Sequence, residues 1–208
     1  MRQTMEIYLE NIGKRFGGSI LFENINVRFR AGQCLAVTGR NGSGKSTLLK
    51  IVAGLLRPSA GQVRFLDTQG AVLSKEQQLA CIGMVAPDMA MYTALTGIEN
   101  IIFWTKVRGV SCTPAEAKVF CQEAGLGRAG LAPVQTYSTG MRQRLKLAVG
   151  KSLEPCVWLL DEPSSNLDTD GKAYVQELMA EALRNQAVIL LATNEPEEAR
   201  YATDKIEL

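Results

Sequence analysis

Apolar residues recur along the chain with two different periods, which predict strands and helices in turn. Residues 1–12 alternate between polar and apolar like a strand, and this pattern continues to residue 29, interrupted by a turn at Gly17 and Gly18. Two runs at residues 157–160 and 188–193 are almost wholly apolar, which is typical of strands buried on both faces of a parallel sheet.

The other segments add shorter strands and longer helices. Helical spacing follows in residues 47–56 and then dominates from about residue 96 to 150, with breaks at glycine and proline. Further strands are expected at residues 33–38, 62–66, 71–73, 81–86 and 204–208, the last as a closing edge strand. The segments on either side of residues 67–70 would form a hairpin. This alternation of strands and helices predicts an α/β fold with a mostly parallel sheet.

The composition is that of an ordinary globular domain and excludes several kinds of catalysis. The 208 residues are 46% hydrophobic and 21% charged, and the net charge of +2 does not indicate a nucleic-acid partner. The sequence contains no histidine, which excludes histidine–metal sites, Ser–His–Asp hydrolysis and Cys–His nucleophiles. The five cysteines form no CxxC pair, which argues against zinc and thioredoxin-like sites, and their odd number favours reduced thiols. Cys34 and Cys156 are expected to be buried as small apolar side chains. No apolar run reaches the roughly 18 residues of a membrane-spanning helix.

A glycine-rich segment between a buried strand and a helix carries the strongest chemical signal. Residues 39–46, GRNGSGKS, fit the phosphate-loop pattern GxxxxGK followed by Ser or Thr, in which glycines let backbone N–H groups converge on phosphate oxygens. Lys45 would contact the β- and γ-phosphates, and the Ser46 hydroxyl would bind Mg²⁺. The expected nucleotide contacts of this loop are Gly39, Asn41, Gly42, Ser43, Gly44, Lys45, Ser46 and Thr47.

Two further polar segments follow in the second half of the chain. Asp161 and Glu162 end an apolar run, and ligands of open α/β sheets bind at such strand ends. Asp161 is expected to hold Mg²⁺, and Glu162 to orient and deprotonate an attacking water. Upstream, Ser138 is placed to cap a helix whose free N-terminus, with Arg142 and Arg144, is a candidate anion site.

These motifs, in this order and spacing, resemble those of the ATP-binding subunits of ABC transporters. Residues 39–47 match the Walker A motif, and residues 157–161 match the Walker B motif. STGMRQ at residues 138–143 resembles the LSGGQ signature, and residues 165–168 resemble the D-loop. Phe16 lies where the family places an aromatic residue that stacks on adenine, and the resemblance runs from about residue 6 to the end.

The resemblance implies a P-loop NTPase fold and a shared mechanism. The fold would be one ABC-type domain over residues 1–208, with a mostly parallel central sheet, an N-terminal antiparallel β subdomain and a helical subdomain inserted at about residues 88–150. Two such domains would pair head to tail around ATP and Mg²⁺. Ser138 and the amides of Thr139 and Gly140 would then touch the γ-phosphate bound by the partner chain, and Asp168 of the D-loop would join the nucleotide contacts.

The chain departs from the family pattern at two positions. The glutamine that normally follows the strand at residues 81–86 is absent, and Pro87 or Asp88 takes its place; Asp88, a hard oxygen donor, is the preferred Mg²⁺ ligand. The switch histidine is replaced by Asn194, whose NH₂ group can donate to the γ-phosphate but brings no charge. Because Glu162 is present, the sequence predicts slow but real hydrolysis.

The resemblance also implies partners. The chain would be a peripheral subunit on the cytoplasmic face of the membrane, bound to separate permease subunits through a groove that includes Met89 and Met91. It would pair with a second ABC ATPase chain, a homodimer being favoured over a heterodimer. The alternative is a weakly active or inactive ATP-binding partner in an asymmetric heterodimer. The run LTGIENIIFW at residues 95–104 is similar to that of the haem-exporter ATPases of cytochrome c maturation, and small ATPases of drug and polysaccharide export share it.

Overall fold

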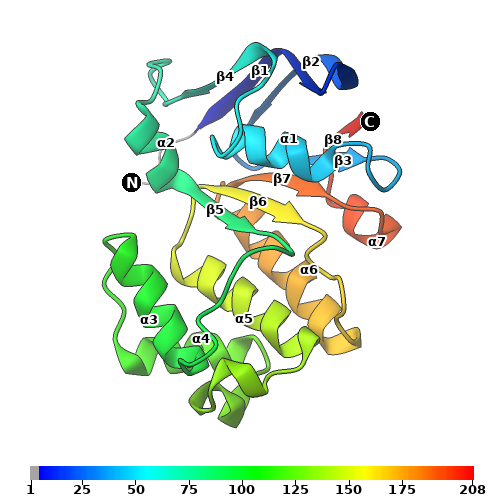
Figure 1. The fold of residues 1–208 in the computed structure, drawn as a ribbon. Coiled ribbons are helices and arrows are strands. Elements are labelled where there is room, and N and C mark those ends of the chain that lie inside the picture. Colours follow the sequence, from blue (N-terminus) through cyan, green and yellow to red (C-terminus); the bar gives the residue numbers. More distant parts are fainter. Residues whose placement is uncertain (1–4) are drawn as a thin grey trace.

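An antiparallel sheet in the order β2-β1-β4 forms one outer layer of the molecule (Figure 1). The computed structural model describes residues 5–208, so the alternation expected at residues 1–4 lies outside the described part. Gly17 and Gly18 turn the chain between the first two strands, with φ of 52° and 87° in the left-handed region that favours glycine. The three strands are β1 (Glu6–Phe16), β2 (Ser19–Arg30) and β4 (Ala60–Leu66). The predicted first hairpin is confirmed.

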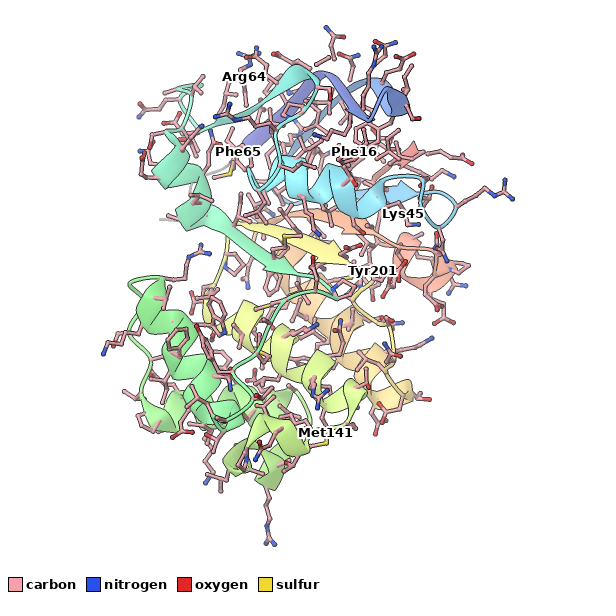
Figure 2. The ribbon with its side chains drawn as sticks, in the orientation of Figure 1. Phe16, Lys45, Arg64, Phe65, Met141 and Tyr201 are labelled. Atoms are coloured by element: carbon pink, nitrogen blue, oxygen red, sulfur yellow. The ribbon has the colours of Figure 1, made fainter. Side chains whose placement is uncertain are left out.

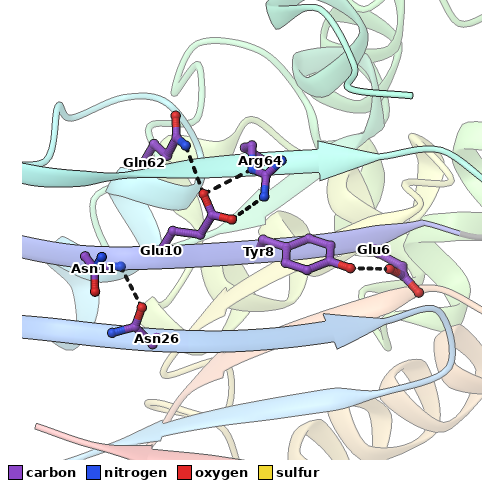
Figure 3. A network of polar contacts seen from close by, with 7 residues as sticks. All are labelled: Glu6, Tyr8, Glu10, Asn11, Asn26, Gln62 and Arg64. Atoms are coloured by element: carbon purple, nitrogen blue, oxygen red, sulfur yellow. Dashed lines mark hydrogen bonds and ion pairs between the residues drawn. The ribbon is translucent and has the colours of Figure 1, made fainter. Parts of the chain in front are cut away.

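The outer face of this sheet carries polar side chains that join neighbouring strands. Glu10 on β1 accepts a hydrogen bond from Gln62 at 2.9 Å and pairs with Arg64, both on β4 (Figure 3). Further along β1, the Tyr8 hydroxyl donates to the Glu6 carboxylate at 2.8 Å. Apolar residues that alternate with these are buried on the inner face, as expected for an antiparallel sheet with one solvated side.

The main sheet is parallel, in the order β5-β6-β7-β3-β8. Every residue of β6 and β7 is buried, which confirms the interpretation of the two apolar runs, and β8 forms an edge beside β3 as expected. Its strands are β3 (Cys34–Thr38), β5 (Ile82–Val85), β6 (Val157–Asp161), β7 (Val188–Ala192) and β8 (Asp204–Glu207). Because β6, β7 and β3 are neighbours, the segments that follow their carboxyl ends lie side by side.

Helices cover both faces of the parallel sheet (Figure 1). α1 (Lys45–Val52) lies between it and the antiparallel sheet, whereas α5 (Thr139–Ser152) and α6 (Thr169–Arg184) pack on the opposite face. Leu190 on β7 belongs to the apolar cluster around α1, and its neighbours Ile189 and Leu191 belong to the cluster around α5 and α6. The core is therefore divided into two layers by the sheet.

A helical region connects β5 to β6 and lies beyond the α5 face of the sheet (Figure 1). Thr96 and Thr113 begin its first two helices with capping boxes, each accepting a hydrogen bond from the N–H of a glutamate in the first turn. The region contains α3 (Gly97–Val107), α4 (Pro114–Glu123), 3₁₀ segments at Gly127–Leu131 and Val134–Thr136, and α5. The helical spacing predicted here is confirmed. Within residues 5–208, no helix is both long and apolar enough to cross a membrane.

Some boundaries differ from the sequence-based expectations. α1 ends at Val52 instead of residue 56, because Gly54 adopts a left-handed φ of 72° and turns the chain. The hairpin expected around residues 67–70 is reduced to one isolated bridge between Leu66 and Val72. α2 (Lys75–Cys81) is not predicted by the apolar pattern because it buries none of its residues, and α7 (Pro196–Ala199) is too short to show a period.

Candidate functional site

The phosphate loop joins β3 to α1, and its shape depends on glycine. Gly44 caps α1 with φ of 109°, and a Cβ at this position would lie 2.8 Å from the ring of Phe22. A Cβ at Gly39, whose φ is 147°, would lie 2.7 Å from the Ser43 hydroxyl oxygen. The Ser43 hydroxyl is buried and has no hydrogen-bond partner among the described residues. The glycines thus let the loop close tightly over the N-terminus of α1.

The Lys45 side chain folds back over this loop. Its Nζ donates to the carbonyl oxygens of Gly39 at 2.8 Å and Arg40 at 3.3 Å, and the residue is only 6% exposed. Figure 2 shows Lys45 at the start of α1. Because both partners are backbone carbonyls and not carboxylates, they leave its positive charge unneutralised. An anion at this helix N-terminus would therefore be strongly favoured.

Ser46 and Asp161 both line the cavity beside this loop, which we call the phosphate cavity. Asp161 ends β6, is 3% exposed and is hydrogen-bonded to the Ser46 hydroxyl. Burial raises the pKa of the Asp161 carboxyl, the Ser46 hydrogen bond opposes this, and the charges of Glu162 and Asp88 raise it further. A buried carboxylate near two others is costly, and a bound cation would relieve the cost. Among the described residues, no three histidine, cysteine or acidic side chains form a metal cluster. Ser46 and Asp161 could hold Mg²⁺ together with phosphate oxygens.

Glu162 and Asn194 follow neighbouring strands. Glu162 has a left-handed backbone with φ of 46°; its N–H donates to the Ala192 carbonyl at 2.8 Å, and its own carbonyl accepts from the Ser165 N–H at 3.0 Å. This turn places the Glu162 side chain in the lining of the phosphate cavity. The Asn194 amide donates to the Asn41 side-chain oxygen of the phosphate loop at 3.1 Å. Both residues expected to be catalytic thus lie beside the loop.

Glu198, which belongs to none of the predicted motifs, fixes both of these segments. Glu198 is 3% exposed, and its carboxylate accepts hydrogen bonds from the Ser164 N–H at 3.1 Å and from the Thr193 hydroxyl. Ser164 lies two residues after Glu162, and Thr193 immediately precedes Asn194. One buried carboxylate therefore positions the two loops that carry the expected catalytic residues. No sequence pattern marks it, because α7 spans only Pro196–Ala199.

Pro87 and Asp88 occupy the segment that follows β5. Pro87 lines the phosphate cavity together with Asp161 and Glu162. The Asp88 carboxylate instead pairs with Lys50 on α1 at 2.6 Å, and this hydrogen bond lowers the pKa of Asp88. Its charge still reaches Asp161, whose pKa it raises. The structure thus brings both candidates close to the site, Pro87 in the cavity lining and Asp88 held by α1.

A buried lysine connects this segment to α5. Lys146 is 8% exposed, and its Nζ donates to the carbonyl oxygens of Ala86 at 3.1 Å and Pro87 at 2.6 Å. Burial lowers the pKa of Lys146, and the charge of Asp88 opposes this effect. In the sequence, Lys146 is only one residue of a predicted helix. Nothing in the sequence marks Lys146 as buried, because helical spacing predicts apolar residues, and not a charged one, on the buried face of a helix.

The turn that resembles the signature begins α5, away from the phosphate loop of the same chain. Ser138 caps the helix by accepting a hydrogen bond from the Met141 N–H at 3.2 Å. Figure 2 shows Met141 well separated from Lys45. Ser138 and Thr139 are exposed, whereas a Cβ at Gly140 would lie 2.9 Å from a carbonyl oxygen of the D-loop. This helix N-terminus is therefore free to meet another molecule.

The expected anion-site role of Arg144 is not supported. Its guanidinium is turned inward, donates to the Ala124 carbonyl at 3.0 Å and pairs with the Asp168 carboxylate. Asp168 also caps α6 by accepting from the Gly171 N–H at 2.9 Å, and this bond together with Arg144 lowers the pKa of Asp168. Arg144 and Asp168 thus hold the D-loop against α5, while Arg142 remains exposed.

Phe16 lies at the rim of the phosphate cavity, which has a volume of about 480 Å³. Its ring is 52% exposed, and Lys14 Nζ lies 4.8 Å from the ring centroid. An exposed ring at such a rim can stack on a planar base. The predicted loop residues that line this cavity are Asn41, Gly42, Gly44, Lys45, Ser46 and Thr47.

Comparisons with known sequences agree with this geometry. The family model described as ABC transporter matches residues 22–165. The cytochrome c biogenesis ATP-binding export protein CcmA of Brucella abortus is 34% identical over 192 residues, covering 92% of this chain and 86% of the relative. The protein of the same name from Mesorhizobium japonicum is 37% identical over 192 residues, covering 92% of this chain and 93% of the relative.

Solved structures agree as well. A structure of the ATP-binding subunit of an ABC transporter has a TM-score of 0.85 and 25% identity, covering 97% of this chain and 85% of the other. A dimeric ATP-binding cassette in a post-hydrolysis state, bound to ADP and Pi, shares the fold, with a TM-score of 0.84, 23% identity, and coverage of 97% of this chain and 94% of the other. The phosphate loop, the acidic end of β6 and the signature-like turn, together with these matches, establish that the chain belongs to the ABC transporter family as an ATP-binding subunit.

Proposed function

We propose that the chain binds Mg-ATP and hydrolyses it to power an ABC export system whose permease is a separate polypeptide. The observation that carries the proposal is the separation of two halves of a phosphate site. The loop with Lys45 and Asp161 forms one half, and the exposed N-terminus of α5 at Ser138 forms the other. Two copies paired head to tail would bring unlike halves together around each ATP. The export direction is supported by the names of the curated relatives.

Within one copy, each polar residue of the site has a separate role. Lys45 and the loop amides hold the β- and γ-phosphates at the N-terminus of α1. Ser46 and Asp161 would hold Mg²⁺, which would neutralise charge at the phosphates. Glu162 orients the attacking water and accepts its proton. Asn194, already oriented by Asn41, donates a hydrogen bond to the γ-phosphate.

The partner copy contributes the signature-like turn. Ser138 and the amides of Thr139 and Gly140 reach the γ-phosphate bound by the first copy. Asp168, held by Arg144, keeps the D-loop in place at the same interface. A homodimer is favoured because one chain contains both halves. An asymmetric heterodimer, with this chain as the less active partner, is the second candidate, and the replacement of the switch histidine by Asn194 favours it.

Hydrolysis is expected to be slow. A hydrogen bond in which one partner is charged contributes about 1.5–3 kcal/mol, and a neutral bond about 0.5–1.5 kcal/mol. The phosphate remains charged when asparagine replaces histidine, so we expect a loss of about 1 kcal/mol, or about fivefold in rate. Asp88, which pairs with Lys50, is a weaker candidate for the place of the missing glutamine than it would be if its carboxylate faced the cavity.

The permease is expected to dock beside the signature turn. Met89 and Met91 line a cavity together with Pro87, Thr139 and Arg142. Methionine side chains adapt to irregular partners, which suits a groove that receives a helix of the permease. This docking would hold the chain as a peripheral subunit at the cytoplasmic face of the membrane.

The test compares Mg-ATP turnover and dimer content, read by light scattering in the same samples, for the wild type and Glu162→Gln. Glu197→Gln, an exposed acid in the same region, is the matched control. We expect turnover in the wild type and the control, and an ATP-trapped dimer without turnover in Glu162→Gln. Unchanged turnover in Glu162→Gln would refute the assigned base. ATP binding without turnover or dimer in any variant would favour the heterodimer.

A further inference from the structure

Two half-buried cysteines, Cys81 and Cys156, lie next to each other at the start of neighbouring strands, so the expected full burial holds for Cys34 but is wrong for Cys156. Cys81 ends α2 and immediately precedes β5, and Cys156 immediately precedes β6. The two strands pair in parallel from Ile82 opposite Val157, so the cysteines are one step before a register pair. Paired strands lie about 4.8 Å apart at such a register pair, and a hydrogen bond joins the side chains of Cys81 and Cys156.

The surrounding contacts fix both cysteines. The Cys156 carbonyl accepts a hydrogen bond from the Val188 N–H of β7 at 2.8 Å, which anchors its backbone to the sheet. On the other side, the Arg108 guanidinium donates to the carbonyls of Leu79 at 2.5 Å and Ile82 at 2.9 Å, and so wraps the end of α2 beside Cys81. Backbone hydrogen bonds therefore hold both cysteines at the start of the two strands.

The protonation of the pair is asymmetric. A hydrogen bond between the thiols, with Cys81 as donor, raises the pKa of Cys81; burial and the charge of Cys156 add to this, and Arg108 opposes it. Cys81 thus keeps its proton, and we assign the first attack to the Cys156 sulfur. Once Cys156 is capped, it no longer brings a negative charge, and the Arg108 guanidinium remains to favour ionisation of Cys81.

We propose that Cys81 and Cys156 are a dithiol modification site that closes to a disulfide with a low-molecular-weight disulfide as oxidant. The Cys156 thiolate attacks one sulfur of the oxidant, its S–S bond breaks, and one thiol leaves. Cys81 then attacks the Cys156 sulfur of this mixed disulfide, and the second thiol leaves with the proton of Cys81. The oxidant is reduced to two thiols, and the protein dithiol is oxidised to one disulfide.

The remaining cysteines do not compete in the same way. Cys34 and Cys121 are fully buried, and burial raises the pKa of Cys34 to about 12 and of Cys121 to about 11. Cys112 is half-buried like the pair, but its thiol donates to the Thr113 carbonyl at 3.7 Å. Cys112 therefore serves as the matched control, because its exposure is similar and the hydrogen bond of its thiol goes to a backbone carbonyl and not to a thiol.

The experiment incubates the folded, reduced chain with oxidised glutathione, blocks remaining thiols with iodoacetamide and maps the peptides by mass spectrometry. We expect a peptide pair joined through Cys81 and Cys156, lighter by two hydrogens, in the wild type and in Cys112→Ser. In Cys81→Ser the resolving thiol is lost, so glutathione should remain attached to Cys156. A wild-type chain that keeps both thiols, or that joins either one to another cysteine as often, would overturn the proposal. Circular dichroism confirms that each variant is folded, and the wild-type map decides the question by itself.

Discussion

Replacing Lys146 by methionine removes the buried ammonium that joins α5 to the segment after β5. Methionine has a similar length and keeps the packing of the side chain, so the change isolates the two hydrogen bonds to the Ala86 and Pro87 carbonyls. The segment that loses them lines the phosphate cavity at Pro87. We therefore expect an effect on ATP turnover in addition to a small effect on stability.

The expected loss of stability depends on which hydrogen-bond partners the two carbonyls keep after the substitution. Two hydrogen bonds from a charged donor contribute about 1.5–3 kcal/mol each. Against this, the Ala86 carbonyl still accepts from the Met89 N–H at 3.1 Å, and Pro87 is exposed, so water can reach its carbonyl. Burying an ammonium also costs several kcal/mol, which the substitution recovers. The expected net loss is about 1 kcal/mol, or about 2–4 °C in Tm.

The assay measures Mg-ATP turnover, ATP affinity and Tm of Lys146→Met beside two controls. If these hydrogen bonds stabilise the conformation in which ATP is hydrolysed, a loss of about 1 kcal/mol there lowers kcat about fivefold and leaves ATP affinity unchanged. Lys151→Met alters the same helix away from the cavity, where Lys151 pairs with Glu123 at 3.0 Å and Glu181 at 2.9 Å, and should keep normal turnover. Lys146→Arg restores charged donors and should recover part of kcat.

Two outcomes would refute this reasoning. If Lys146→Met lowers Tm but turns over ATP at the wild-type rate, the contact serves stability alone. If Lys151→Met loses as much kcat as Lys146→Met, the effect belongs to the helix in general and not to its link with Pro87.

Three further predictions concern the loop, the docking groove and the D-loop. Gly44→Ala places a Cβ 2.8 Å from the Phe22 ring on β2, at a φ of 109°, and should lower the free energy of unfolding in urea by about 3 kcal/mol. Gly54→Ala, with open space around its Cβ, should lower it by about 1 kcal/mol. Equal losses would contradict the steric argument. Met91→Glu should release the permease in co-purification without changing ATP affinity, and an intact complex would count against the groove. The Gly171 N–H and Arg144 lower the pKa of Asp168 in the folded state, so its contribution to stability is present above the ordinary aspartate pKa of about 3.9 and is lost as the pH falls through the lowered value. Asp168→Asn should therefore make the free energy of unfolding fall less steeply at acid pH. An unchanged acid part of the stability–pH curve would exclude this contribution.

The sequence predicts well the features that depend on residues close together in the chain. The alternation around Ile7 and Leu9 identifies β1 because one face of an antiparallel sheet is buried. The phosphate loop is readable because its glycines, Lys45 and Ser46 must follow one another to close around a phosphate. Asp161 is found because a buried parallel strand has few polar residues, and its polar end stands out.

The contacts that position the site depend on residues far apart in the sequence, and no local pattern reveals them. Lys146 lies 60 positions from Ala86, and Glu198 lies 34 positions from Ser164. A buried charge of this kind is acceptable only because the fold brings backbone carbonyls or N–H groups to it. For Arg144, a local pattern predicts a role that a long-range contact prevents. Its place near a helix N-terminus favours an anion site, whereas the tertiary structure turns it toward Asp168.

These long-range contacts converge on α5. Beyond Lys146, the Gln143 amide donates to the Pro163 carbonyl at 2.9 Å, next to Glu162, and Arg144 holds the D-loop through Asp168. A hydrogen bond of this length is lost when its atoms separate beyond about 3.5 Å, so α5 cannot shift by much more than half an ångström unless the three segments follow it. In the proposed dimer the N-terminus of this helix contacts the ATP of the partner copy, and the same helix grips the segments around its own ATP. Lys146→Met removes one of the three links and leaves the other two in place, which is why we expect turnover to fall several-fold and not to vanish.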